Sequence, residues 1–286
     1  LLGIAAAAFR ATGELPRIET VYTPDERTSI EGVAVSRSGL YVTLLQNVKG
    51  RLLRFRVDAD SGKWSAEPLP LPPNGTVSLS AANPHSETVL VNYEAHITPD
   101  RLSEYDAGAN ALTLLKSLPP RFRSDELQVR QHMTKSADGE AVPYFVIHRK
   151  GLKLDGSTPT ILYGYGGFEI SLKPSYSATI GKLWLERGGA YAVANIRGGG
   201  EFGPRWHKAA LKTTRQRAYD DFIAVAEDLS RRSITSPRRL GISGGSNGGL
   251  LVGAIFTQRP DLLNAVVCRV PLLDMLRYTK LLAGAS

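Results

Sequence analysis

The sequence has 286 residues and a formal net charge of +8, with 42% hydrophobic and 22% charged residues. These fractions are ordinary for a globular chain with a sizeable core, and the length predicts roughly two domains. The apolar stretch at the N-terminus, residues 1–9, is too short for a transmembrane helix, so we expect no membrane partner. The basic cluster at residues 231–239 lacks the interleaved aromatic side chains of a protein that binds single-stranded nucleic acid, so we expect no nucleic acid partner.

The N-terminus carries neither an initiator Met nor a basic leader. A signal peptide is therefore not indicated, and we expect a chain that was cut at its N-terminus. The single cysteine, Cys268, lies in an apolar run and is expected to pack as a small hydrophobe, because it has no partner for an internal disulfide. A cytoplasmic location is favoured, and a periplasmic one remains an alternative.

Residues 10–119 contain short alternating or apolar runs between Gly, Pro, Asn and Asp, which predict an all-β region. The expected strands are residues 29–36, 39–45, 50–57, 76–80, 87–92 and 100–105. Turn residues at 36–39 and 83–86 recur after about 47 residues, which is close to the length of a propeller blade. Two blades fit this length but are too few to close a ring. A β-sandwich is the alternative that the pattern leaves open.

Pro119 and Pro120 begin a linker-like stretch, and after it strands alternate with helices. We therefore expect one domain over residues 1–119 and a second over residues 120–286. In the second domain the expected strands are residues 142–148, 160–163, 190–196, 240–243 and 266–270. The expected helices are residues 177–187, 215–232 and 247–259.

The expected helix at residues 215–232 has one apolar stripe at helical spacing. The stripe consists of Tyr219, Phe222, Ile223, Ala226 and Leu229. Asp220, Asp221 and Glu227 are expected to form a solvated face on the other side of this helix.

Two glycine-rich loops follow expected strands. Gly198 to Gly203 has the glycine spacing of a dinucleotide site, but neither an immediate helix nor the required acidic residue follows, so we reject that interpretation. Tyr163-Gly-Tyr-Gly-Gly167 comes where α/β-hydrolases place one half of the oxyanion hole. A tyrosine hydroxyl there is able to donate to a developing oxyanion. The alternative is that Tyr163 and Tyr165 are core residues.

The stretch from Leu240 to Ala254 reads as a nucleophile elbow, in which a strand stops, a serine occupies a strained corner and a helix starts at once. Two Gly-x-Ser-x-Gly patterns overlap here. Ser246 is favoured over Ser243, because a helical pattern follows Ser246 directly whereas Ser243 still belongs to the strand. A plain glycine-rich turn is the structural alternative.

Gly244-Gly-Ser246-Asn-Gly-Gly-Leu-Leu-Val252 resembles the active-serine motif of the prolyl oligopeptidase family of serine peptidases. Residues 162–168, 194–208 and 258–261 resemble the same family in the same order. The resemblance is dense from about Gln131 to Ser286 and thin before it. It implies an α/β-hydrolase fold beside a β-propeller, and it favours the propeller over the sandwich for residues 1–119.

The resemblance also implies roles for individual residues. Ser246 is the expected nucleophile, and the Tyr165 hydroxyl and the backbone N–H of Asn247 are the expected oxyanion hole. Phe168 and Leu272 match positions that line the proline-accepting pocket, although the family often has valine where this chain has Leu272. Ordinary core packing is the alternative for both.

The rest of the catalytic triad is not evident in this chain. In α/β-hydrolases the acid and the histidine follow the serine, but all five histidines precede Ser246. Asp261 and Asp274 follow it at positions that do not suit a triad acid. The resemblance implies that the acid and the histidine lie beyond Ser286, so we expect a fragment that lacks both ends of a bacterial-type prolyl oligopeptidase.

The complete protein is expected to hydrolyse short peptides after proline through a Ser246 acyl-enzyme, and the fragment alone is expected to be inactive. An esterase on the same fold and a non-catalytic, propeller-containing binding module are the alternatives. No set of His, Cys and acidic residues has the spacing of metal ligands, so neither a metal nor another cofactor is expected.

Overall fold

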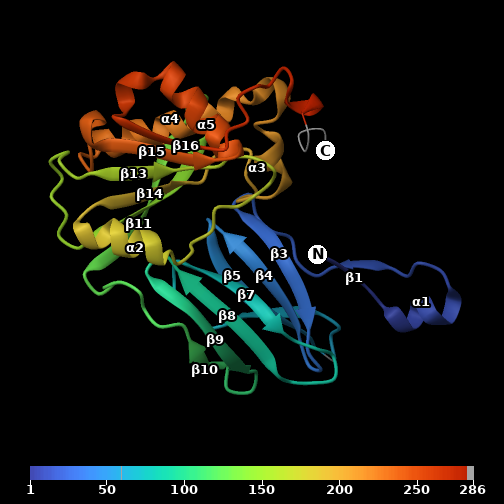
Figure 1. The fold of residues 1–286 in the computed structure, drawn as a ribbon. Coiled ribbons are helices and arrows are strands. Elements are labelled where there is room, and N and C mark those ends of the chain that lie inside the picture. The colour runs from blue at the N-terminus through green and yellow to red at the C-terminus, as the bar shows by residue number, and fades with distance from the viewer. Residues whose placement is uncertain (59, 282–286) are drawn as a thin grey trace.

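The structure, a computed structural model, describes residues 1–58 and 60–281. Two antiparallel sheets form the lower half of the molecule, and a mixed sheet flanked by helices forms the upper half (Figure 1). This arrangement confirms the predicted α/β-hydrolase fold preceded by propeller blades. None of the helices in the described residues is both long and apolar enough to cross a membrane.

The N-terminal residues form a small unit that extends to one side of the blades (Figure 1). It comprises strand β1 (Leu2–Ile4), helix α1 (Ala6–Thr12) and strand β2 (Ile18–Thr20), and β1 pairs with β2. None of these elements was predicted. No residue of α1 is buried, so the sequence has no apolar stripe that would have marked it as a helix.

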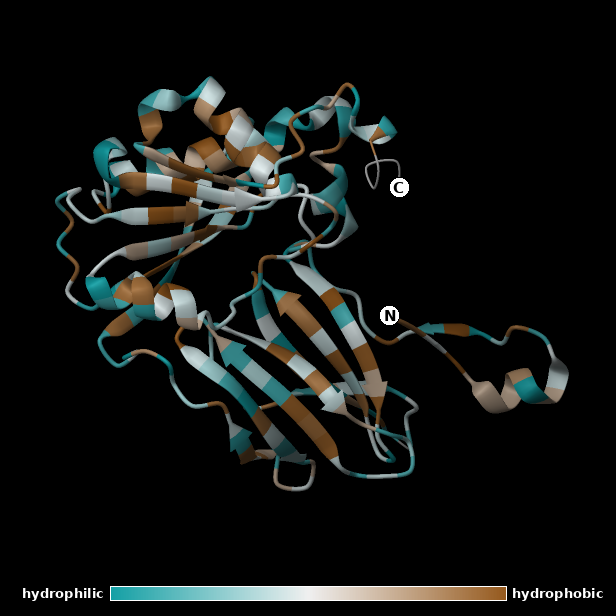
Figure 2. Cartoon of the chain, in the orientation of Figure 1, coloured by the Kyte–Doolittle hydropathy of each residue, from teal (hydrophilic) through white to brown (hydrophobic). Residues whose placement is uncertain are grey.

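The two lower sheets each contain four antiparallel strands that are neighbours in chain order, as in propeller blades. The first sheet consists of β3 (Thr28–Val35), β4 (Leu40–Gln46), β5 (Lys49–Val57) and β6 (Trp64–Pro68). The second consists of β7 (Gly75–Ala81), β8 (Val89–Ala95), β9 (Thr98–Asp106) and β10 (Ala111–Ser117). Figure 2 shows hydrophobic and hydrophilic residues alternating along β3.

The blades pack on each other through buried side chains from both sheets, including Tyr41, Leu52, Val77 and Tyr105. The outermost strands, β6 and β10, were not predicted. In both strands most residues are half-buried or exposed, so their sequences lack the alternation that burial of one face imposes.

The upper sheet has six strands in the order β11, β12, β14, β13, β15, β16. Strands β13 to β16 are parallel to one another, whereas β11 and β12 form an antiparallel edge. The bounds are β11 (Leu127–Lys135), β12 (Ala141–Arg149), β13 (Thr160–Tyr163), β14 (Ala190–Ala194), β15 (Leu240–Gly245) and β16 (Ala265–Arg269). Strand β11 was not predicted, because it is an edge strand with only two buried residues.

Helices α4 (Gln216–Arg231) and α5 (Asn247–Gln258) pack against each other and the sheet through Phe222, Val225, Leu251 and Ile255. The predicted helix at residues 177–187 is instead α2 (Ala178–Leu183) followed by a 3₁₀ turn. The helix ends at Leu183, and the indole N–H of the following residue, Trp184, donates to the Ala190 carbonyl at 2.7 Å. Helix α3 (Pro204–Lys208) is a single short turn.

The two halves meet where strands β3 and β7 of the blades contact the segment between β13 and α2. The Lys173 ammonium pairs with Glu31 at 2.8 Å, and the Thr76 hydroxyl donates to the Pro174 carbonyl at 2.7 Å. Val48 joins a buried cluster with Phe145 of the upper half. Residues 118–126 connect β10 to β11 without a strand or helix, and the domain division at residue 119 stays a prediction.

Candidate active site

Ser246 occupies the corner between β15 and α5. Its backbone has φ 56° and ψ −117°, a left-handed conformation that a non-glycine residue adopts only under constraint, and its side chain is exposed. Ser243 lies inside β15, where it pairs with Tyr163 on one side and Val267 on the other. Of the two overlapping serine motifs, only the one centred on Ser246 therefore has the geometry of a nucleophile elbow.

The corner requires glycine on both sides of Ser246, because the backbone segments nearly touch. A Cβ atom on Gly244 would lie 2.1 Å from the carbonyl oxygen of Gly248. A Cβ atom on Gly248 would lie 2.7 Å from the carbonyl oxygen of Gly164. The carbonyl of Arg269, at the end of β16, accepts the Ser246 backbone N–H at 3.0 Å and fixes the corner to the sheet.

The structure brings Tyr165 and Asn247, the residues of the predicted oxyanion hole, together from two distant segments. Asn247 is the first residue of α5, so its backbone N–H lies in the first turn, where amides have no partner within the helix. The Asn247 side-chain amide donates to the Tyr165 carbonyl at 2.6 Å. The Tyr165 ring lies beside the start of α5, since a Cβ atom on Gly248 would be 3.5 Å from it.

Arg215 also contacts both segments, although nothing in the sequence pointed to it. Its guanidinium donates through Nη1 to the Gly166 carbonyl and through Nη2 to Asn247 Oδ1, the latter at 3.2 Å. The guanidinium also lies over the Tyr219 ring, 5.4 Å from its centroid. The only sequence signal was its position at the start of a predicted helix, and that position does not reveal contacts with distant loops.

Phe168 and Leu272 have different environments. Phe168 is 67% exposed and has a positive φ of 54°, so it is not a core residue. Leu272 is half-buried in the segment after β16. The same segment packs closely on α5. A Cβ atom added at Gly249 of α5 would lie only 2.8 Å from Pro271. Tyr163 is half-buried and stacks on Tyr191 with ring centroids 6.4 Å apart.

The two acids that follow Ser246 form local ion pairs. Asp261 pairs with Arg259 at 2.8 Å, and Asp274 pairs with Arg277 at 2.6 Å. His207, the histidine nearest to Ser246 in the sequence, has its Nδ1 2.7 Å from the Gly198 carbonyl oxygen and 3.1 Å from the backbone nitrogen of Glu169.

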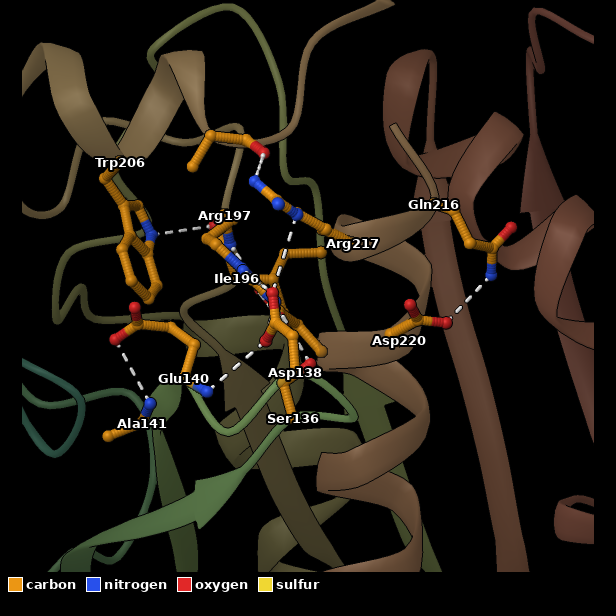
Figure 3. Close-up of polar contacts among 12 residues, drawn as sticks. Ser136, Asp138, Glu140, Ala141, Ile196, Arg197, Trp206, Gln216, Arg217 and Asp220 are labelled. Atoms are coloured by element: carbon orange, nitrogen blue, oxygen red, sulfur yellow. Dashed lines mark hydrogen bonds and ion pairs between the residues drawn. The ribbon is translucent and has the colours of Figure 1, made fainter. Parts of the chain in front are cut away.

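A buried ion-pair network supports the glycine-rich loop after β14 (Figure 3). Arg197 is 3% exposed and bonds Asp221 at 2.6 Å, Asp138 at 2.5 Å and the Ser136 hydroxyl at 3.1 Å. Burial alone would lower the pKa of Arg197, but its hydrogen bonds to Asp221 and Asp138 raise it. The same hydrogen bond from Arg197 lowers the pKa of Asp138.

This network corrects the prediction that Asp221 belongs to a solvated face, because the Asp221 side chain is fully buried. Its carboxylate also accepts the backbone N–H of Arg197 at 2.9 Å. Asp220 is half-buried, and the Glu227 side chain is 43% exposed. The helical pattern placed Asp221 on a solvated face and did not reveal a cationic partner 24 residues earlier.

Glu201 lies in the same glycine-rich loop and is 1% exposed. Its Oε1 accepts the backbone N–H of Leu172 at 3.0 Å and the side-chain amide of Asn195 at 3.3 Å. Burial raises the pKa of Glu201 to about 7. The loop therefore joins β14 to the segment that meets the blades, which is a structural role unlike that of a dinucleotide site.

Comparison with known proteins agrees with this geometry. The family model described as "Prolyl oligopeptidase family" matches residues 174–282, and that of the family's N-terminal β-propeller domain matches residues 7–118. An uncharacterized peptidase of Sinorhizobium fredii is 50% identical over 278 residues, which are 96% of this chain. The chain belongs to the prolyl oligopeptidase family.

Two further members of the prolyl oligopeptidase family illustrate the similarity. A prolyl endopeptidase of Elizabethkingia miricola is 37% identical over 277 residues, covering 97% of this chain and 39% of that protein. The structure of a post-proline cleaving enzyme from Rickettsia typhi superposes with a TM-score of 0.85 at 36% identity, covering 95% of this chain and 39% of that one.

Prolyl oligopeptidase B of Galerina marginata, bound to a 25mer macrocyclization substrate, superposes with a TM-score of 0.85 at 28% identity over 94% of this chain and 38% of that one. The present chain spans about 38% of the length of the Sinorhizobium relative as well.

Proposed function

We propose that this chain supplies the nucleophile and the oxyanion-stabilising groups of a serine peptidase that hydrolyses short peptides after proline. The observation that carries the proposal is the corner at Ser246. An exposed serine with a constrained backbone stands directly before the first N–H of α5, and the loop of Tyr165 is hydrogen-bonded to that same residue, Asn247. This combination matches the requirements of acyl transfer.

In the proposed reaction the Ser246 hydroxyl attacks the peptide carbonyl and forms a tetrahedral intermediate. The Asn247 N–H and the Tyr165 hydroxyl donate hydrogen bonds to the negative oxygen. The intermediate then expels the amine and leaves an acyl-enzyme on Ser246, which water hydrolyses. A histidine base must accept the Ser246 proton and return it to the leaving amine. By the family resemblance this histidine, with its acid, lies outside the 286 residues.

The preference for proline rests on two supports. Relatives with 37% and 36% identity are named a prolyl endopeptidase and a post-proline cleaving enzyme. In addition, Phe168 presents an exposed aromatic ring three residues after Tyr165, where it is free to contact a proline ring of the substrate. We propose that Phe168 and Leu272 bind that ring. A peptide as substrate agrees with the macrocyclization substrate bound to the Galerina enzyme.

The test uses the full-length protein, by which we mean these 286 residues together with the remaining length that the curated relatives have. We compare the rates of hydrolysis of three substrates. Two are matched chromogenic peptides with proline or alanine before the cleaved bond, and the third is an ester of the same acyl group. We expect cleavage of the proline peptide that disappears in Ser246→Ala. Hydrolysis of the ester alone would favour an esterase, and activity that survives Ser246→Ala would exclude the proposed nucleophile.

We further propose that the 286-residue chain by itself does not turn over peptides. Ser246 requires a base to remove its proton, and every histidine of the chain precedes it in sequence. Purified chain assayed with the proline peptide is expected to match buffer alone. Turnover that is lost in Ser246→Ala would show that one of the five histidines present acts as the base.

A further inference from the structure

Arg215 links two segments that the proposed reaction needs in a fixed relation. It stands between a 3₁₀ turn and α4, half-buried, and its guanidinium reaches the Gly166 carbonyl with one nitrogen and Asn247 Oδ1 with the other. Gly166 neighbours Tyr165, and Asn247 neighbours Ser246. One side chain therefore contacts both the loop after β13 and the start of α5.

The contact with Asn247 also fixes the orientation of its amide group. A guanidinium has only donors, so the amide must present its oxygen to Arg215 and its NH₂ group to the opposite side. On that side the NH₂ group donates to the Tyr165 carbonyl at 2.6 Å. Arg215, Asn247 and Tyr165 thus form a chain of hydrogen bonds that closes on the loop through the Gly166 carbonyl.

We propose that Arg215 is a positioning residue that holds the Tyr165 hydroxyl and the Asn247 N–H in the relation that oxyanion stabilisation requires. The inference rests on the function proposed above. The two donors are 82 residues apart in the chain, and the covalent structure does not fix their separation. Donors must lie within hydrogen-bond distance of the developing oxyanion, and small displacements are costly.

The chemistry of arginine suits this position. Its planar guanidinium presents several donors in a rigid arrangement, so it reaches two acceptors on different segments at once. Stacking over Tyr219 restrains the plane of the guanidinium. A lysine carries the same charge but concentrates its donors on one atom, so it is expected to hold one of the two acceptors at a time.

The first experiment compares Arg215→Met and Arg215→Lys in the full-length protein, with Arg217→Met as the matched control. Arg217 lies two residues away, and its side chain is 46% exposed and paired with Asp138 at 3.5 Å. We expect Arg215→Met to lower kcat about 10- to 100-fold with KM nearly unchanged, because misplaced donors act in the transition state. Arg215→Lys should recover part of the loss, and Arg217→Met should resemble wild type.

A peptidyl aldehyde, which forms a tetrahedral adduct with the active serine, separates positioning from a general structural role. Its inhibition constant should rise across the Arg215 variants in parallel with the loss of kcat/KM, while that of the cleaved product peptide stays constant. Thermal melting identifies variants that fail to fold. If Arg215→Met does not fold, Arg215→Lys is assayed in the same way.

A double variant tests whether Arg215 acts through Tyr165. If it does, Arg215→Met combined with Tyr165→Phe should lose less activity than the product of the two single losses. Wild-type kcat in a folded Arg215 variant, a change in KM alone, or losses that multiply fully would each overturn the inference. Peptidase activity that survives Ser246→Ala would instead overturn the proposed function, so the two failures are distinguishable.

Discussion

The Ser246 backbone, with φ 56° and ψ −117°, lies where serine is strained, so its neighbours must impose the conformation. Three contacts do so: the Arg269 carbonyl accepts its N–H at 3.0 Å, its own carbonyl accepts the Leu250 N–H at 3.1 Å, and two glycines allow the backbones to approach. The Ser246 side chain is exposed. The strain is therefore consistent with a nucleophile that must be accessible to substrate.

Tyr165→Phe in the full-length protein tests the oxyanion role of the tyrosine. The variant keeps the ring and the hydrogen bond between the Tyr165 carbonyl and Asn247, and it removes only the hydroxyl. We expect kcat to fall on the order of 10²- to 10³-fold with little change in KM, because the donor acts mainly in the transition state. A raised KM with kcat intact would instead make Tyr165 a substrate-binding residue.

Asp221→Asn tests the buried network, and Asp220→Asn is its matched control one residue earlier. Asp221 is fully buried against Arg197, whereas Asp220 is half-buried and accepts from the Gln216 side chain at 2.9 Å. We expect Asp221→Asn to lower the free energy of unfolding by on the order of 3 kcal/mol and Asp220→Asn by less than about 0.5 kcal/mol. Urea denaturation of the 286-residue chain measures both. Equal effects would contradict a structural role for this pair.

The sequence predicted Ser246, Tyr165 and Asn247 as candidates because their signals are local. A strand, a glycine turn and a helix follow one another within 15 residues, and this order alone marks the corner. Asp221 and Arg215 could not be assessed in this way. Their surroundings come from residues 24 and 32 positions away, which no periodic pattern within one helix reveals.

At the scale of elements, the turn between β15 and α5 depends on glycine at residue 244. Gly244→Ala would place a methyl group 2.1 Å from the Gly248 carbonyl oxygen, so the turn has to open. Gly241→Ala in the same strand is the control, since its nearest neighbour would be Ala265 at an ordinary 3.6 Å. We expect Gly244→Ala to lower peptidase activity of the full-length protein at least tenfold and to destabilise it by about 1–3 kcal/mol.

Gly241→Ala should retain activity and stability close to those of wild type. Activity assays and thermal melting of the two variants give the comparison. Equal activity in both variants would show that the corner tolerates a side chain at residue 244 and that its close packing is not needed for function.

Strands with several buried residues were predicted well, and the strands that were missed bury two residues or none. Strands β4, β8, β12 and β15 alternate or run apolar, because one or both of their faces are covered. Strands β6 and β10 lie at sheet edges and have no buried residue, so backbone pairing rather than side-chain burial holds them in place. Pairing of this kind leaves little trace in a sequence.

At the scale of the whole molecule, the blades and the upper half with its mixed sheet share a buried contact at His96. This residue lies in the turn between β8 and β9, 7% exposed, with its ring centroid 5.3 Å from that of Phe145 in β12. Within the described residues His96 Nε2 has no hydrogen-bond partner. Burial lowers the pKa of His96 to about 4, so the folded protein holds it neutral above that pH.

The pH dependence of stability tests this contact. The unfolded chain binds a proton at His96 near pH 6.5, whereas the folded chain does so only near pH 4. The contribution of neutral His96 to the free energy of unfolding is therefore complete above about pH 6.5. It is lost as the pH falls toward 4, and the total loss is about 3 kcal/mol.

His96→Gln should remove this loss of stability on acidification. His85→Gln is the control at an exposed blade loop, and it should lose as much stability as wild type. Urea midpoints of the three chains at pH 4 and pH 7 give the comparison. If His96→Gln lost as much stability on acidification as wild type, His96 would not be the group that resists protonation at this contact.

The most direct test of the proposed function is to identify the residue that reacts with a serine-directed fluorophosphonate in the full-length protein. We expect one adduct, mapped by mass spectrometry to Ser246 rather than Ser243, with peptidase activity falling in proportion to labelling. Ser246→Ala should show neither adduct nor activity. An adduct at Ser243 that abolishes activity, or full cleavage of the proline peptide by Ser246→Ala, would contradict a mechanism through Ser246.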